Sequence, residues 1–201
     1  MVEQVTEMLR KLVRGVYPWI RSEKANWPQL IVKLQKYNPK LYHYSVVWQR
    51  LERDRVKCNT DGASKGNPGD NSIGFCIRDH EGNLLYAKAK GIGVTTNTEA
   101  ESIAILEALQ YCMGKDLTGV MVETYSLSLK KMIEKQWNVP WELVERVEEI
   151  RVLVHKLQAS LTHTFREGNC VADALANEVV ESQSTKEYNT FQELPSSIRR
   201  H

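Results

Sequence analysis

The order of strand-like and helix-like segments after about residue 55 is the feature that most constrains the fold. Three segments with strand-like alternation come first, at residues 56–61, 73–78 and 84–90. Amphipathic helical segments then alternate with short apolar strands as far as residue 180. Parallel strands need crossover helices, and such helices cover the faces of the sheet. The order therefore predicts an α/β fold.

The remaining elements can be placed from their apolar spacing and their caps. Strands are expected at residues 120–124 and 161–165, and helices at 97–113, 126–137, 140–157 and 169–180. The predicted order is βββαβααβα. We therefore expect a five-stranded mixed sheet flanked by helices, whose first three strands form an antiparallel meander.

The N-terminal region is predicted to be helical and is basic. Apolar residues follow helical spacing at residues 2–16, and a second short helix is expected at 28–37. Residues 1–56 carry eleven Lys/Arg and five Asp/Glu, a balance of +6, so the rest of the chain carries −4 of the net +2. Such a segment suits phosphate contact, but also a solvated helical region or one that binds a protein partner.

These patterns divide the chain into three parts. Residues 1–55 are predicted to be a basic helical segment with an extended connector, whose Tyr42, Tyr44 and Trp48 would pack on the next domain or stack on bases. Residues 56–182 are predicted to be the α/β domain, and the polar residues 183–201 a flexible tail. Neither a membrane-spanning apolar run nor a secretory signal is evident, which predicts an intracellular protein, nuclear or cytoplasmic, that is not secreted and has no membrane partner.

Three acidic residues occupy positions from which they could meet. Asp61 ends a predicted strand and precedes a Gly- and Pro-rich stretch, residues 62–69. Glu101 lies in the first turn of one predicted helix and Asp173 near the start of another. Taken singly, such a stretch is usually a hairpin connection, and carboxylates near helix starts are commonly solvated or capping groups.

The motifs around these acids change that interpretation. In chain order they are Asn59-Thr60-Asp61-Gly62-Ala63-Ser64-x-Gly66-Asn67-Pro68-Gly69, Asn97-x-x-Ala100-Glu101, Glu123-Thr124-x-Ser126 and His163-x-x-Arg166-Glu167-x-Asn169-x-x-Ala172-Asp173-x-Leu175-Ala176. Together they resemble the ribonuclease-H-like domain of plant reverse-transcriptase-like proteins that derive from retroelements. The resemblance covers about 125 residues and matches the order of elements as well as the motifs.

The resemblance implies a ribonuclease-H-like fold in which acids from different elements converge at one sheet edge. Asp61, Glu101 and Asp173 would hold two Mg²⁺ (or Mn²⁺) ions, which take oxygen ligands and can clamp the attacking and leaving oxygens of a phosphodiester. The implied substrate is the RNA strand of an RNA–DNA hybrid, which is recognised by its 2′-hydroxyls. The residues expected to contact nucleic acid are Gly62, Ala63, Ser64, Lys65, Gly66, Asn67, Asn97, Arg166 and Asn169.

One position departs from the family pattern. The family has aspartate, a fourth catalytic acid, where this chain has Tyr125. A phenol is neutral at pH 7 and is a poor ligand for a hard dication, so the family expectation is weak or absent cleavage. Glu123 lies on the same side of the strand but about 7 Å further along it, and Glu99 faces away from Glu101 on the helix, so neither is a good replacement.

Other side chains leave alternatives open. His163 matches a histidine that assists proton transfer or product release in some relatives, but it could equally be a partly buried structural histidine. Arg166 could contact phosphate or pair with Glu167. Trp137 and Trp141 are expected to be core anchors rather than platforms for base stacking.

Three functions therefore compete. The favoured hypothesis is a nucleic-acid-binding domain that retains the fold and three acids but has an impaired metal site. The second is an active Mg²⁺- or Mn²⁺-dependent ribonuclease that tolerates Tyr125. The third is a protein-interaction module that binds its partner through residues 1–55.

Overall fold

A computed structural model of the chain describes residues 2–16, 26–35, 46 and 51–200. The chain forms two compact units, Met1–Ser45 and Val46–His201. Within the described residues, no helix combines the length and apolar character needed to cross a membrane.

The first unit contains the two helices that the sequence predicts. They are α1 (Val2–Val16) and α2 (Trp27–Gln35). Asn26 and Gln29 cap α2 reciprocally, because each side-chain amide oxygen accepts from the backbone N–H of the other residue, at 3.2 and 3.1 Å. Of the predicted connector at residues 42–48, only Val46 lies within the described part of the chain.

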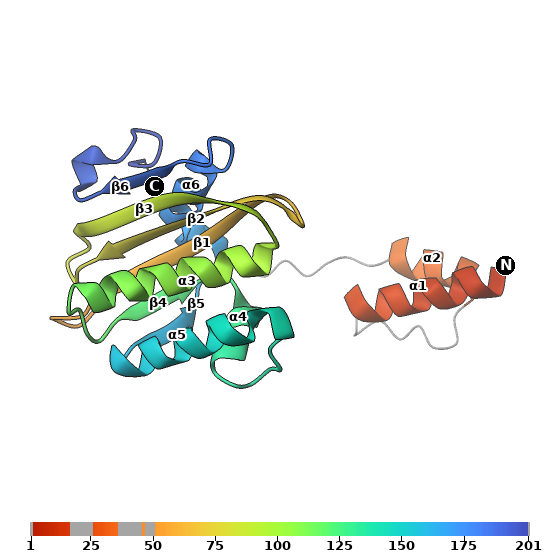
Figure 1. Cartoon of the computed structure of the whole chain (residues 1–201). Coiled ribbons are helices and arrows are strands. Elements are labelled where there is room, and N and C mark those ends of the chain that lie inside the picture. Colours follow the sequence, from red (N-terminus) through yellow and green to blue (C-terminus); the bar gives the residue numbers. More distant parts are fainter. Residues whose placement is uncertain (1, 17–25, 36–45, 47–50, 201) are drawn as a thin grey trace. The chain divides into compact units, whose positions relative to one another are not determined.

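The second unit is built on a mixed sheet of six strands (Figure 1) in the order β5-β4-β1-β2-β3-β6. The neighbouring pairs β1–β2, β2–β3 and β3–β6 are antiparallel, and β1–β4 and β4–β5 are parallel. The strands are β1 (Lys57–Gly66), β2 (Gly69–Arg78), β3 (Leu84–Thr95), β4 (Met121–Thr124), β5 (Ser160–His163) and β6 (Thr185–Tyr188). Strands β1 to β3 form the predicted antiparallel meander, and β4 and β5 are the predicted parallel strands. This arrangement confirms the predicted α/β class.

The sixth strand corrects the prediction of a flexible C-terminal tail. Strand β6 pairs with β3, and the Gly91 N–H donates to the carbonyl of Ser184 at 2.9 Å. After the short helix η3 (Phe191–Glu193), the side chains of Leu194 and Ile198 are buried beside α6 residues. The sequence pattern missed this segment because β6 lies at the sheet edge and carries mostly polar side chains, while the buried anchors occur singly.

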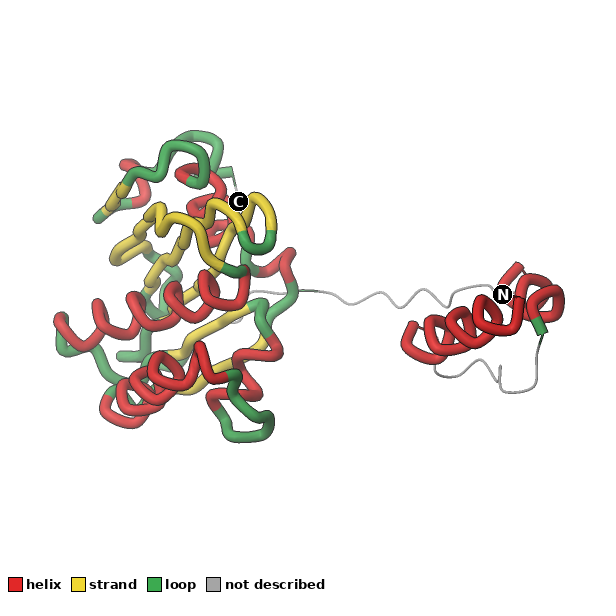
Figure 2. Tube along the Cα trace, turned by 45° about the vertical axis from the view of Figure 1, so that its right-hand side comes forward, coloured by secondary structure: helices red, strands yellow, loops and turns green. Residues whose placement is uncertain are grey.

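Helices cover both faces of the sheet. One face packs against α3 (Asn97–Gly114), α4 (Leu127–Ile133) and α5 (Val144–Lys156), and Figures 1 and 2 show α3 and α5 side by side. The other face packs against α6 (Cys170–Val179). Two short helices, η1 (Trp141–Leu143) and η2 (Arg166–Gly168), precede α5 and α6. The two faces therefore have separate apolar cores.

The prediction that two tryptophans anchor the core is wrong. Helix α4 ends at Ile133 rather than near residue 137, so the chain that follows runs over the surface. Trp141 is 87% exposed, and Trp137 is exposed with the Lys131 ammonium 4.8 Å from its ring centroid. Leu143 occupies the buried position instead.

Two glycines let helices approach the sheet closely. A Cβ on Gly62 of β1 would lie 2.8 Å from the backbone nitrogen of Glu101, and one on Gly74 of β2 would lie 2.4 Å from the carbonyl oxygen of Ala172. Because these neighbours are backbone atoms, a larger residue would force the helix away. The starts of α3 and α6 are thereby held against the middle of the sheet.

We predict that the C-terminal segment contributes to the stability of the fold. Ile198→Ala removes a side chain that is only 3% exposed and should lower the free energy of unfolding by about 2–4 kcal/mol. Val94→Ala, at a side chain that is 70% exposed, should change it by less than about 1 kcal/mol. Urea denaturation followed by circular dichroism measures both, and equal effects would contradict a packed C-terminal segment.

Candidate active site

Most of the predicted site residues line one cleft. It has a volume of about 500 Å³ and lies where β1 meets the starts of α3 and α6. Its lining residues are Asp61, Gly62, Ala63, Ser64, Gly66, Asn67, Asn97, Glu101, Tyr125, Arg166, Asp173 and Asn177. Of these, only Asn177 is absent from the sequence-based set. It lies one helical turn after Asp173, a spacing that could have suggested it.

Three of the predicted residues lie outside this cleft. The ammonium of Lys65 pairs with the carboxylate of Glu181. Asn169 is buried, and its side-chain N–H donates to the carbonyl of Thr60 at 2.9 Å. This bond ties the start of α6 to β1, so Asn169 positions the helix. Because its side chain is buried, the prediction that Asn169 contacts nucleic acid directly is corrected.

His163 is the third residue outside the cleft lining. It lies on β5, partly buried, with its ring centroid 6.2 Å from that of Tyr125 and 5.8 Å from that of Phe165. The imidazole thus packs among aromatic rings. This placement agrees with the structural alternative for His163, while its role in proton transfer stays a prediction.

The Gly- and Pro-rich stretch is mainly strand rather than loop. Strand β1 continues to Gly66 and β2 starts at Gly69, so only Asn67 and Pro68 form the turn. The Asn67 side-chain oxygen accepts from the backbone N–H of Asn97 at 3.1 Å. The hairpin is therefore fastened to the first residue of α3, and both asparagines border the cleft.

The two innermost acids are buried. Burial, followed by the carboxylate of Asp173, raises the pKa of Asp61 to about 7. Burial, followed by the charge of Asp61, raises the pKa of Glu101 well above its usual value. The site therefore concentrates negative charge that the protein compensates only in part, which favours protons or added cations.

The donor set fits a divalent metal, although the carboxylates do not converge on one point. Glu101 Oε2 is buried and has no hydrogen-bond partner among the described residues. Such an orphaned anionic oxygen is the ligand type that Mg²⁺ and Mn²⁺ accept. As they stand, however, no three acidic, histidine or cysteine side chains in the described part of the chain are grouped closely enough to hold an ion.

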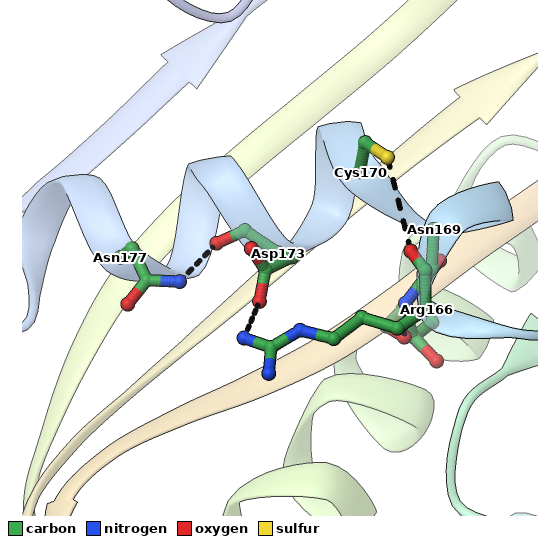
Figure 3. A network of polar contacts seen from close by, with 6 residues as sticks. Arg166, Asn169, Cys170, Asp173 and Asn177 are labelled. Atoms are coloured by element: carbon green, nitrogen blue, oxygen red, sulfur yellow. Dashed lines mark hydrogen bonds and ion pairs between the residues drawn. The ribbon is translucent and has the colours of Figure 1, made fainter.

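Asp173 makes an ion pair within the cleft (Figure 3). Its Oδ1 lies 2.8 Å from Nη2 of Arg166, and its backbone carbonyl accepts from the Asn177 side chain at 2.8 Å. The ion-pair partner of Arg166 is thus Asp173 and not the Glu167 that the sequence suggested, while contact with phosphate stays a prediction. The pair links Asp173 of α6 to η2.

Tyr125 follows the last residue of β4 and contributes to the cleft wall. Its side chain is 49% exposed. The structure thus places the phenol where the resemblance implies a carboxylate, beside Asp61, Glu101 and Asp173 in one cavity.

Neither alternative acid replaces the missing carboxylate. Glu123 Oε1 pairs with the buried Lys57 ammonium at 2.8 Å, and its Oε2 accepts from the Asn59 side chain at 2.8 Å. Glu99 accepts from the backbone N–H of Thr96 at 2.9 Å in the capping box of α3. Both carboxylates are committed to structural contacts and do not line the cleft.

Similarity to known proteins identifies the family. Residues 59–179 match the model of the family described as reverse transcriptase-like. The chain belongs to this family. The match includes all three acids and Tyr125.

The two relatives described next carry ribonuclease H names. The chain is 32% identical to ribonuclease HI of Halobacterium salinarum over 129 residues, which are 63% of this chain and 65% of that protein. It is 31% identical to a protein of Arabidopsis thaliana with a provisional ribonuclease H name over 123 residues, which are 61% of this chain and 20% of that protein. The chain thus spans less than two thirds of the length of these two relatives.

Solved structures agree with this assignment. The crystal structure of RNase H1 from Halobacterium salinarum superposes with a TM-score of 0.61 at 30% identity, covering 64% of this chain and 98% of that one. LC11-RNase H1 in complex with an RNA/DNA hybrid gives a TM-score of 0.59 at 31% identity, covering 63% and 97%. The ribonuclease-H-like fold predicted from the sequence is thereby confirmed.

We predict that the acid cluster makes stability depend on pH. In the metal-free protein, the free energy of unfolding should fall as pH rises from about 4 to about 7, because the folded-state pKa of Asp61 exceeds its unfolded value and ionisation then favours the unfolded chain. Asp61→Asn should remove much of this slope. Denaturation at several pH values in EDTA measures it.

Asp79→Asn is the matched control for this prediction. Hydrogen bonds from Asn83 and neighbouring backbone groups outweigh desolvation and lower the pKa of Asp79, so its contribution falls below the tested window. Its variant should keep the slope between pH 4 and 7. A slope that is equally steep in Asp61→Asn would contradict the prediction.

Proposed function

We propose that this domain binds RNA–DNA hybrid and that Tyr125 impairs its metal-dependent cleavage. The observation that carries the proposal is the cleft that Asp61, Glu101 and Asp173 line together with the Tyr125 phenol, which stands where the resemblance implies the fourth acid. The hybrid in the structure of LC11-RNase H1, a relative of 31% identity, supports the substrate class.

The cleft offers groups suited to sugar and phosphate rather than to base edges. The residues Gly62 to Ser64, Asn67 and Asn97 line the cleft and carry peptide and amide groups. Amide and peptide groups can exchange hydrogen bonds with 2′-hydroxyls in the wide minor groove of an A-like duplex. Recognition would then depend on the type of duplex and not on its sequence.

The proposed metal ligands are the carboxylates of Asp61, Glu101 and Asp173, with Mg²⁺ or Mn²⁺ as the ion. A bound dication would stabilise the charge that develops on phosphate oxygens. The chain's own contribution is to hold three acids on three elements, and Tyr125 supplies no fourth charge to fix a second ion. Impaired cleavage follows from this loss.

The first test is cleavage of a labelled RNA–DNA hybrid in Mg²⁺ and separately in Mn²⁺. Tyr125→Asp should cleave at least about 100-fold faster than wild type, because it restores a charged group that acts on the transition state. Tyr125→Asn is the matched control, since it removes the bulky ring without adding a charge. It should stay close to wild type.

Each outcome of this test has a distinct meaning. Wild-type cleavage that Asp61→Asn abolishes would overturn the impaired-site proposal and indicate a working ribonuclease H. Equal gains in Tyr125→Asp and Tyr125→Asn would show that the ring, and not the missing charge, is the obstacle.

We further predict that the cleft distinguishes hybrid from DNA duplex. Asn97→Ala should weaken hybrid binding about three- to tenfold, the size of one or two hydrogen bonds, and affect DNA duplex less. Asn189→Ala, an exposed asparagine outside the cleft, should leave both affinities unchanged. Fluorescence anisotropy over a range of salt concentrations measures the affinities. Absence of any salt-dependent hybrid binding by wild type would overturn the proposed function itself.

A further inference from the structure

The ion pair between Arg166 and Asp173 occupies the acid cluster itself. The guanidinium Nη2 lies 2.8 Å from Asp173 Oδ1, as Figure 3 shows. Among the described residues that line the cleft, Arg166 is the only basic one, and it shares the cleft with Asp61 and Glu101 as well as Asp173. The guanidinium therefore already neutralises a carboxylate that the proposed metal would need as a ligand.

The two halves of Arg166 differ in how firmly they are held. Its backbone carbonyl accepts from the Asn169 N–H at 3.0 Å, and η2 is closed by the Gly168 N–H donating to Phe165 at 2.9 Å. Its side chain is 68% exposed, and among the described residues its side-chain partner is Asp173. An exposed ion pair of this kind is worth little in water, so the guanidinium can leave at low cost.

Asp173, by contrast, is anchored by its helix. Its backbone N–H donates to the Asn169 carbonyl at 3.1 Å, and Asn169 is fastened to β1 through Thr60. The helix cannot withdraw the carboxylate from the cluster, because α6 packs closely on Gly74. The contact can therefore open by movement of the Arg166 side chain alone.

We propose that Arg166 is a built-in counter-cation that competes with a divalent metal for Asp173. Without metal, the guanidinium offsets the repulsion among the three acids. A dication must displace it to use both oxygens of Asp173, which weakens metal binding. The inference rests on the proposed metal site, and it adds a competitor for one of its three proposed ligands.

The test compares wild type with Arg166→Gln in the full chain. The variant should bind Mn²⁺ about three- to tenfold more tightly, because a competing charge and its ion pair are gone. It should also unfold at a lower temperature than wild type in EDTA and gain more from added Mn²⁺. Electron paramagnetic resonance of free Mn²⁺ and thermal unfolding provide two readouts that do not depend on cleavage.

Two further variants make the result specific. Lys186→Gln removes a cation that pairs with Glu178 of α6 at 2.7 Å, outside the cleft, and should leave the Mn²⁺ affinity unchanged. Arg166→Lys keeps the positive charge and should return the affinity toward the wild-type value.

The outcomes separate this inference from the proposed function. Equal or weaker Mn²⁺ binding in Arg166→Gln, with wild type binding measurably, would overturn the competition and leave the metal site standing. No Mn²⁺ binding by either protein would overturn the metal site and the competition together. Hybrid binding by wild type in EDTA would in either case still support the nucleic-acid function.

Discussion

Repulsion among three carboxylates held in one partly buried cleft is the constraint around which this domain is organised. Gly62 and Gly74 let α3 and α6 pack so closely on β1 and β2 that Glu101 and Asp173 are brought to Asp61. Bringing the carboxylates together costs free energy, and the packing of the two apolar cores offsets this cost. Protonation and the Arg166 guanidinium relieve it within the chain itself.

The sheet and its helices could be predicted because each element carries a local signal. Strand-like alternation marked β1 to β3, short apolar segments between helices marked β4 and β5, and apolar spacing marked the helices of both units. The sixth strand had no such signal, because β6 is held by pairing with β3 and its neighbours Leu194 and Ile198 are isolated apolar residues without a helical or strand period. The exposure of Trp141 was likewise not predictable from local spacing, because it follows from the early end of α4 at Ile133.

The composition of the site was predictable from motifs, whereas its internal contacts were not. Asp61, Glu101, Asp173 and Tyr125 line one cleft, as the motif spacing predicted. Spacing does not reveal which partner a long side chain chooses. The pairing of Glu123 with buried Lys57, and of Arg166 with Asp173, depends on burial and on distances between elements. The hydrogen bond from Asn169, at the start of α6, to Thr60 of β1 could not be predicted either, because it also joins two elements far apart in the sequence.

Tyr125 and Arg166 are best understood together. Where the resemblance implies four acids, this cleft has three, so the formal charge of its acids changes from −4 to −3 when all are ionised, and the Arg166 guanidinium offsets one of these charges. A less negative site needs less added cation to hold its acids together, and it repels the phosphates of a nucleic acid less strongly. If these two residues weaken a two-metal site, as proposed, they would also make binding without metal easier. The proposed loss of cleavage and the proposed hybrid binding would then share one electrostatic cause.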